Sequence, residues 1–123
     1  MKKFLLPALL LISLCGCYND KAELLYPCTL STADSITYSG TVGPILITNC
    51  ASAPGCHMDE STNISGVKLN NVAGAQVIAK NTKLLGVINH TAGFLEMPKG
   101  GAKLKDCDIL KITKWVESGA LNN

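Results

Sequence analysis

Arginine is absent from the 123-residue sequence, and this absence narrows the possible functions. Without guanidinium groups, the chain has no side chain that binds a phosphate through two parallel hydrogen bonds. Its charges are also nearly balanced, with eleven lysines against nine acidic residues. A chain of this charge offers nucleic acid little electrostatic attraction. We therefore expect no nucleic-acid partner.

Other missing features exclude further classes. No Cys-x-x-Cys pair is present, and His57 and His90 are the only histidines, so the residues of a structural zinc site are lacking. Internal repeats and low-complexity stretches are missing too, so the length predicts one domain at most. The longest apolar run, residues 4–14, is too short to cross a bilayer as a helix.

That apolar run follows Met1-Lys2-Lys3 and precedes Leu14-Cys15-Gly16-Cys17. Two lysines, a short apolar stretch and small residues at a cut point predict an export signal over residues 1–16. The last four residues resemble a lipobox, in which Cys17 is acylated and begins the mature protein. We expect an exported protein anchored by lipid to the cell envelope, on its periplasmic or outer-membrane face. An ordinary signal peptide that happens to contain cysteines is the alternative.

Cleavage before Cys17 removes two lysines and leaves 107 residues with nine lysines and nine acidic residues. Four further cysteines remain, and in an oxidising compartment two disulfides are their ordinary state. However, Cys50 and Cys56 are followed at once by His57. A cysteine pair ending in Cys-His is the attachment pattern of c-type haem, in which both thiols bind vinyl groups and the histidine reaches the iron.

The spacing of this motif is unusual. Five residues separate Cys50 from Cys56, whereas the usual haem attachment pattern has two residues between its cysteines. The intervening residues 51–55 are small, and Pro54-Gly55 favours a turn, so they can loop out. The alternative is a Cys50–Cys56 disulfide beside an idle histidine. If Cys50 and Cys56 hold haem, the two remaining cysteines are left to pair, which gives a disulfide between Cys28 and Cys107.

Secondary-structure signals predict an all-α domain of about four short helices with long loops. Residues 17–40 are polar and turn-rich and are expected to form a tether and arm, and residues 41–123 the domain. Helices are expected at 41–49, at 72–80 after an Asn71 cap, at 82–89 after an Asn81 cap, and from an Asp106 cap to Gly119. Such long loops are unusual in so small a domain. A haem at the centre would explain them, because it would supply core that the chain lacks.

A second axial ligand is expected in the glycine-rich loop before the last helix. Met97 is followed by Pro98, which stiffens the chain, and it lies forty positions after His57. A thioether there suits an electron carrier. Alternatively, Met97 packs as an ordinary loop residue. His90 is a competing ligand, or it hydrogen-bonds a haem propionate or a loop carbonyl.

Several segments resemble one family, the bacterial, Bacteroidetes-type lipoproteins with a monohaem cytochrome c-like domain. They are residues 17–20 (CYND), 25–27 (LYP), 83–94 (KLLGVINHTAGF), 97–104 (MPKGGAKL), 106–109 (DCDI) and 115–120 (WVESGA). The resemblance implies one covalent haem c attached at Cys50 and Cys56, with His57 and Met97 as axial ligands. The chain departs from cytochromes c at large in its expanded attachment motif.

With both axial positions taken, such an iron carries single electrons and catalyses no reaction at the metal. We therefore expect an electron carrier for a redox partner protein rather than an enzyme. Three lysines cluster after Met97, and they are Lys99, Lys103 and Lys105. Around an exposed haem edge they could steer an acidic redox partner, and the alternative is that they are ordinary solvated residues. The expected apolar wall of the haem pocket is Leu84, Leu85, Ile88, Phe94 and Trp115. The alternative function is a non-haem structural or binding lipoprotein with the same helices and a Cys50–Cys56 disulfide.

Overall fold

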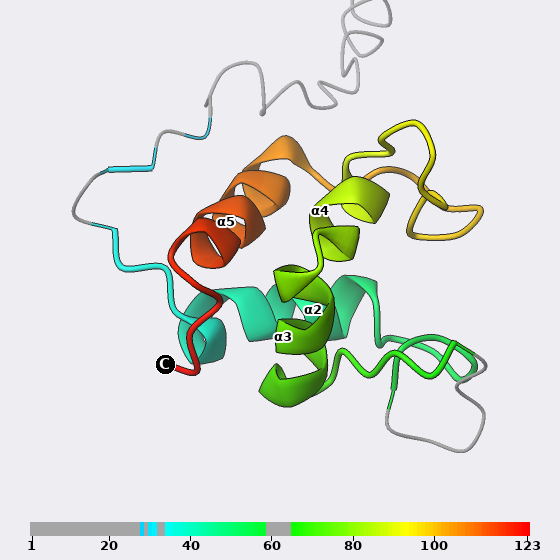
Figure 1. Ribbon diagram of the computed structural model, residues 1–123, viewed down its shortest axis with the longest axis horizontal. Coiled ribbons are helices and arrows are strands. Elements are labelled where there is room, and N and C mark those ends of the chain that lie inside the picture. Colours follow the sequence, from blue (N-terminus) through cyan, green and yellow to red (C-terminus); the bar gives the residue numbers. More distant parts are fainter. Residues whose placement is uncertain (1–27, 29, 32–33, 59–64) are drawn as a thin grey trace, which may run out of the picture.

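The computed structural model describes residues 28, 30–31, 34–58 and 65–123, and this part of the chain contains helices and no strand. The elements are a π-helical turn η1 (Tyr38–Val42) and the helices α2 (Gly43–Asn49), α3 (Val72–Lys80), α4 (Lys83–Ile88) and α5 (Asp106–Glu117). η1 contacts α2 and α5, and α4 contacts α3 and α5 (Figure 1). The all-α prediction and the four short helices are confirmed for the described residues.

Local capping explains where α3 and α4 begin. The Asn71 side chain accepts a hydrogen bond from the Gly74 N–H at 2.9 Å, so α3 begins where the sequence predicts. Asn81 was predicted to cap α4, but the N-cap is Thr82, and Asn81 is the residue before it. The Asn81 side chain still accepts a hydrogen bond from the Lys83 N–H at 3.1 Å. Helix α4 begins one residue later than expected, because Thr82 has left-handed backbone angles with a φ of 66°.

The N-terminus of α5 differs from the prediction. Asp106 was expected to cap this helix, but the N-cap is Lys105, and no side-chain capping bond is formed. The backbone N–H groups of Asp108 and Ile109 both donate to the Lys105 carbonyl at 3.0 Å, so the helical hydrogen bonding begins one residue earlier. Asp106 therefore lies inside the first turn, where a carboxylate still interacts favourably with the helix dipole.

The C-terminus of α5 is closed as predicted at Gly119. The Gly119 N–H donates to the Val116 carbonyl at 3.0 Å, and the Ala120 N–H donates to the Trp115 carbonyl at 2.9 Å. This pair of bonds turns the chain back toward the core. The indole N–H of Trp115 then reaches the Leu121 carbonyl at 2.8 Å, which satisfies the polar atom of a fully buried side chain.

Trp115 lies at the centre of a core to which every helix contributes. Its ring packs against Tyr38 with centroids 5.6 Å apart. The Tyr38 hydroxyl is buried without a hydrogen-bond partner among the described residues, and burial raises the pKa of Tyr38. Other buried core residues include Val42, Leu46, Leu69, Ala75, Ile78, Leu84, Ile88, Ile109 and Ile112. Ile36 and Tyr38, from the expected arm, thus pack on the domain.

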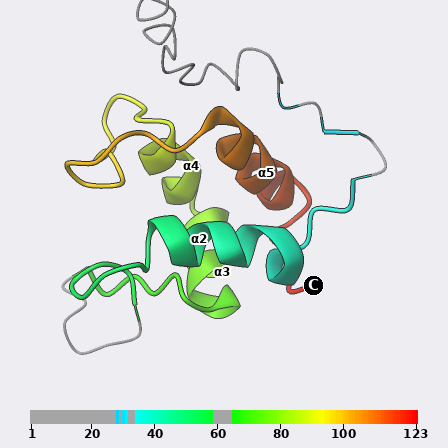
Figure 2. The same cartoon turned by 180° about the vertical axis from the view of Figure 1, so that it is seen from behind.

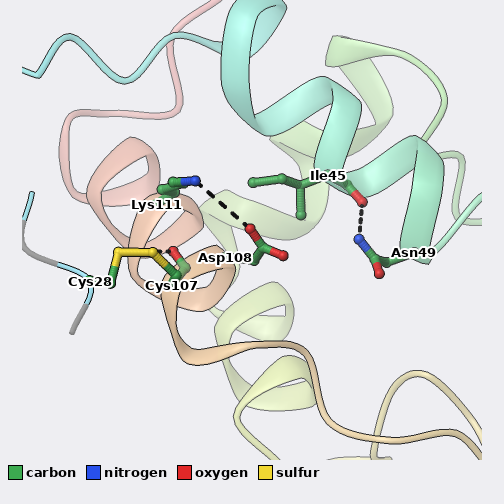
Figure 3. Close-up of polar contacts among 6 residues, drawn as sticks. All are labelled: Cys28, Ile45, Asn49, Cys107, Asp108 and Lys111. Atoms are coloured by element: carbon green, nitrogen blue, oxygen red, sulfur yellow. Dashed lines mark hydrogen bonds and ion pairs between the residues drawn. A yellow bond between two sulfur atoms is a disulfide. The ribbon is translucent and has the colours of Figure 1, made fainter. Parts of the chain in front are cut away.

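The predicted disulfide between Cys28 and Cys107 is present (Figure 3). It joins the segment before η1 to the first turn of α5, with the two Cα atoms 5.1 Å apart. On the same helix Lys111 pairs with Asp108 at 4.0 Å. The bridge fastens the N-terminal arm to the domain, as the cysteine count predicts when Cys50 and Cys56 are assigned to haem.

Candidate functional site

Helix α2 delivers Cys50 to the start of a folded loop over residues 50–57. Cys50 is the C-cap of α2 and donates its N–H to the Leu46 carbonyl at 2.8 Å. A turn follows in which the Cys56 N–H donates to the Ala53 carbonyl at 3.1 Å. Pro54 and Gly55 form its centre, and the φ of 82° at Gly55 is the angle that glycine adopts without strain in a type II turn.

The two ends of this loop meet. The His57 N–H donates to the Cys50 carbonyl at 3.1 Å, so the backbone of His57 returns to that of Cys50. The five residues between the cysteines are thereby looped out, as the sequence predicts. Beyond the loop, the Leu69 N–H donates to the His57 carbonyl at 2.8 Å and ties the site to the buried side chain of Leu69.

The imidazole of His57 is oriented by its Nδ1 atom. Nδ1 lies 3.0 Å from the Val67 carbonyl oxygen and 3.1 Å from the Ser65 hydroxyl oxygen. A carbonyl oxygen only accepts hydrogen bonds, so this contact selects the tautomer with the proton on Nδ1, in which Nε2 carries the lone pair. Metal-binding histidines commonly have this arrangement, with one nitrogen donating to a backbone carbonyl and the other facing the metal.

The two cysteines of the loop are free thiols in different surroundings. Cys56 is exposed, whereas Cys50 is partly buried and packs against the core. Burial, with a smaller contribution from the negative charge of ionised Cys56, raises the pKa of Cys50 from 9.0 to about 11. At neutral pH the Cys50 thiol is therefore protonated. The alternative Cys50–Cys56 disulfide is not formed in this structure.

Met97 lies half-buried in the loop of residues 89–104, which follows α4. Its N–H donates to the Val87 carbonyl of α4 at 3.1 Å. The Phe94 ring covers Gly86, where an added Cβ would lie 2.6 Å from ring atoms, so only glycine allows this contact. The loop is thus held on the surface of α4.

His90 contacts the backbone of the same loop. Its Nε2 atom lies 3.1 Å from the Met97 carbonyl oxygen, and its Nδ1 atom lies 3.7 Å from a carboxylate oxygen of Glu96. The hydrogen bond to a loop carbonyl, one of the roles considered for His90, is present in the structure. Nε2 is then a donor to Met97 and has no lone pair for a metal.

Figures 1 and 2 show how the two loops lie relative to the helices. The loop that contains Cys50 and His57 and the loop that contains Met97 extend from the same end of the helical domain in both views. The C-terminus lies at the opposite end. The loop after α2 and the loop after α4 therefore extend from one end of the molecule, although they are far apart in sequence.

The residues of the expected apolar wall differ in their burial. Leu84, Ile88 and Trp115 are buried in the helical core, and Leu85 is half-buried. Phe94 is 38% exposed and lies on α4. Sequence reasoning missed Val67, because the group that orients His57 is a backbone carbonyl, which no residue type reveals.

Two features are absent from the described residues: a metal-binding cluster of side chains and a membrane-spanning helix. These residues contain no group of three or more His, Cys, Asp or Glu side chains that could hold a metal ion. They also contain no helix with the length and apolar character needed to span a bilayer. The predicted signal, residues 1–16, and the predicted lipid-bearing Cys17 lie outside the described residues.

Comparison of the chain with protein-family models gave no match, and comparisons with curated proteins and with solved structures gave none either. The function therefore rests on the residues of the site and their geometry.

Proposed function

We propose that this protein is a c-type cytochrome, exported and anchored by lipid on Cys17, that carries single electrons to or from a partner protein. The observation that carries the proposal is the orientation of His57. Its ring donates from Nδ1 to the Val67 carbonyl, which leaves Nε2 as the metal-binding nitrogen, beside a loop that bears two free thiols.

The donor set fits one covalently attached haem. The thiols of Cys50 and Cys56 would each add across one vinyl group of the haem, sulfur to one carbon and hydrogen to the other. His57, through Nε2, and Met97, through its thioether, would be the two protein ligands of the iron. The bound group supplies a one-electron iron couple, and Met ligation raises its potential. With both positions taken, no substrate binds the metal, and electron transfer rather than catalysis follows.

The surface near Met97 suits a redox partner of opposite charge. Lys99, Lys103 and Lys105 are exposed, and they lie between Met97 and the start of α5. Lysines in such a position steer an acidic partner during encounter, and they affect the association rate more than the final affinity. We therefore expect electron exchange with that partner to slow as the ionic strength rises.

A second candidate is supported by the packing of the core. Leu84, Ile88 and Trp115 are each no more than 1% exposed and belong to one continuous hydrophobic core. A domain that is closed in this way suits a non-haem structural or binding lipoprotein. In that protein Cys50 and Cys56 would form a disulfide after export.

Expression together with a haem c maturation system separates the two candidates. The cytochrome proposal predicts a red protein whose haem stays with the polypeptide after acid–acetone extraction. Cys56→Ser should retain at most one thioether and show a red-shifted pyridine haemochrome band. Ser52→Ala, an exposed position of the same loop, is the matched control and should behave as wild type. A colourless wild-type protein with a Cys50–Cys56 disulfide would favour the second candidate.

A further inference from the structure

His90 occupies a backbone conformation that needs an explanation. Its φ is 55°, in the left-handed region that residues other than glycine seldom adopt. It follows the end of α4, where the Asn89 N–H donates to the Leu85 carbonyl. The left-handed residue reverses the chain and brings the imidazole against the loop that returns toward α4. Strain of this kind persists where surrounding contacts hold it.

The contacts that hold the loop converge on Met97. Its N–H donates to the Val87 carbonyl at 3.1 Å, and its carbonyl accepts from His90 Nε2 at 3.1 Å. Both main-chain polar atoms of Met97 are therefore fixed by residues at the end of α4. Pro98 follows and restricts the backbone further. With its main chain held on both sides, Met97 has a fixed Cα–Cβ direction, from which its thioether extends.

We propose that His90 is a positioning residue that holds Met97 as an axial ligand by donating from Nε2 to the Met97 main-chain carbonyl. The inference rests on the proposed function, since it assumes that the Met97 thioether is the ligand. It assigns His90 to the Met97 side of the site, with Nε2 engaged by the Met97 carbonyl rather than by the iron. The Glu96 carboxylate is 68% exposed and 3.7 Å from Nδ1, so this surface pair contributes little.

Two substitutions at residue 90 isolate the hydrogen bond. His90→Asn suits a left-handed backbone, but its amide is too short to reach the position of Nε2. His90→Gln places an amide N–H near that position and should restore the bond. Glu96→Gln is the control for the surface ion pair.

The first readout is hydrogen exchange of the Met97 amide, which needs no haem. Loss of one hydrogen bond should speed this exchange about tenfold in His90→Asn. The second readout is imidazole binding to the ferric haem-loaded protein, where imidazole competes with Met97. Its apparent affinity should rise about tenfold in His90→Asn, because the state with Met97 released is more populated. His90→Gln and Glu96→Gln should stay near wild type in both measurements.

The proposal for His90 is overturned if His90→Asn matches wild type in both measurements, if His90→Gln is as impaired as His90→Asn, or if Glu96→Gln has an equal effect. These results differ from a failure of the proposed function. In that case the wild-type protein takes up no haem, or its ferric spectrum lacks the Met–iron band, while the exchange measurement still decides whether His90 holds Met97.

Discussion

Alkylation of the haem-free protein should distinguish the two thiols of the 50–57 loop by their rates. Burial raises the pKa of Cys50 from 9.0 to about 11, and the charge of ionised Cys56 adds to the shift. Only the thiolate reacts, and at pH 8 its fraction falls from about a tenth for an ordinary thiol to about a thousandth for Cys50. Ionisation alone therefore reduces the reactive population about a hundredfold.

The higher pKa also makes each thiolate more nucleophilic, which offsets part of this loss. With a Brønsted slope of about 0.4–0.5, two pKa units recover roughly tenfold in rate. We therefore expect Cys50 to react at least about tenfold more slowly than an ordinary exposed thiol. Cys56 is exposed, so burial does not slow its reaction, and it should be modified first.

The assay is iodoacetamide modification between pH 7 and 11, with the two sites assigned from fragment ions. The rate at Cys50 should keep rising up to about pH 11. Cys56→Ser removes the neighbouring charge, so the pKa of Cys50 should fall but stay above 9.0, because burial is the larger cause. The fold should also lose stability as the pH rises from about 9 to about 11, because the unfolded chain ionises Cys50 first. Equal rates at both sites, or no reaction before a reductant is added, would refute this reasoning.

Three further predictions concern the rest of the chain. Replacing Cys28 and Cys107 by serine opens a bridge that spans 79 positions and should lower the free energy of unfolding by about 2–5 kcal/mol in urea denaturation; an unchanged midpoint would contradict a structural role. Tyr38→Phe removes a buried hydroxyl without a partner among the described residues, so thermal denaturation should show unchanged or higher stability, and a clear loss would reveal an unseen partner. Cys17→Ser should abolish incorporation of labelled fatty acid and release the protein from the membrane fraction; labelling equal to wild type would disprove the lipobox.

Much of the helical fold follows from local sequence signals. Helix α3 has its predicted bounds because Asn71 caps it, and capping depends on residues three positions apart. The first turn of α5 was less predictable, since Asp106 suits both the cap and the first helical positions, and the choice depends on the backbone at Lys105. The Pro54-Gly55 turn is similarly local and was predicted.

The candidate site was predictable in its residues but not in its orientation. Cys50, Cys56 and His57 are identified by a motif of reactive side chains. In contrast, His57 is oriented by the Val67 carbonyl and Met97 is held through its own carbonyl by His90. Backbone carbonyls have no signature in residue type, so these contacts emerge only from the fold. The contact of the Phe94 ring with Gly86 was not predicted, because it depends on the missing side chain of a glycine on another element, α4.

The central claim is covalent attachment of one haem at Cys50 and Cys56, and a single peptide mass tests it most directly. Trypsin cleaves after Lys21 and Lys68, so both cysteines and His57 fall within the peptide of residues 22–68. After coexpression with a haem c maturation system and reduction of the Cys28–Cys107 disulfide, this peptide should carry the added mass of one haem, with neither Cys50 nor Cys56 open to alkylation. A peptide without the added haem mass, in which Cys50 and Cys56 are both alkylated after reduction, would contradict covalent attachment.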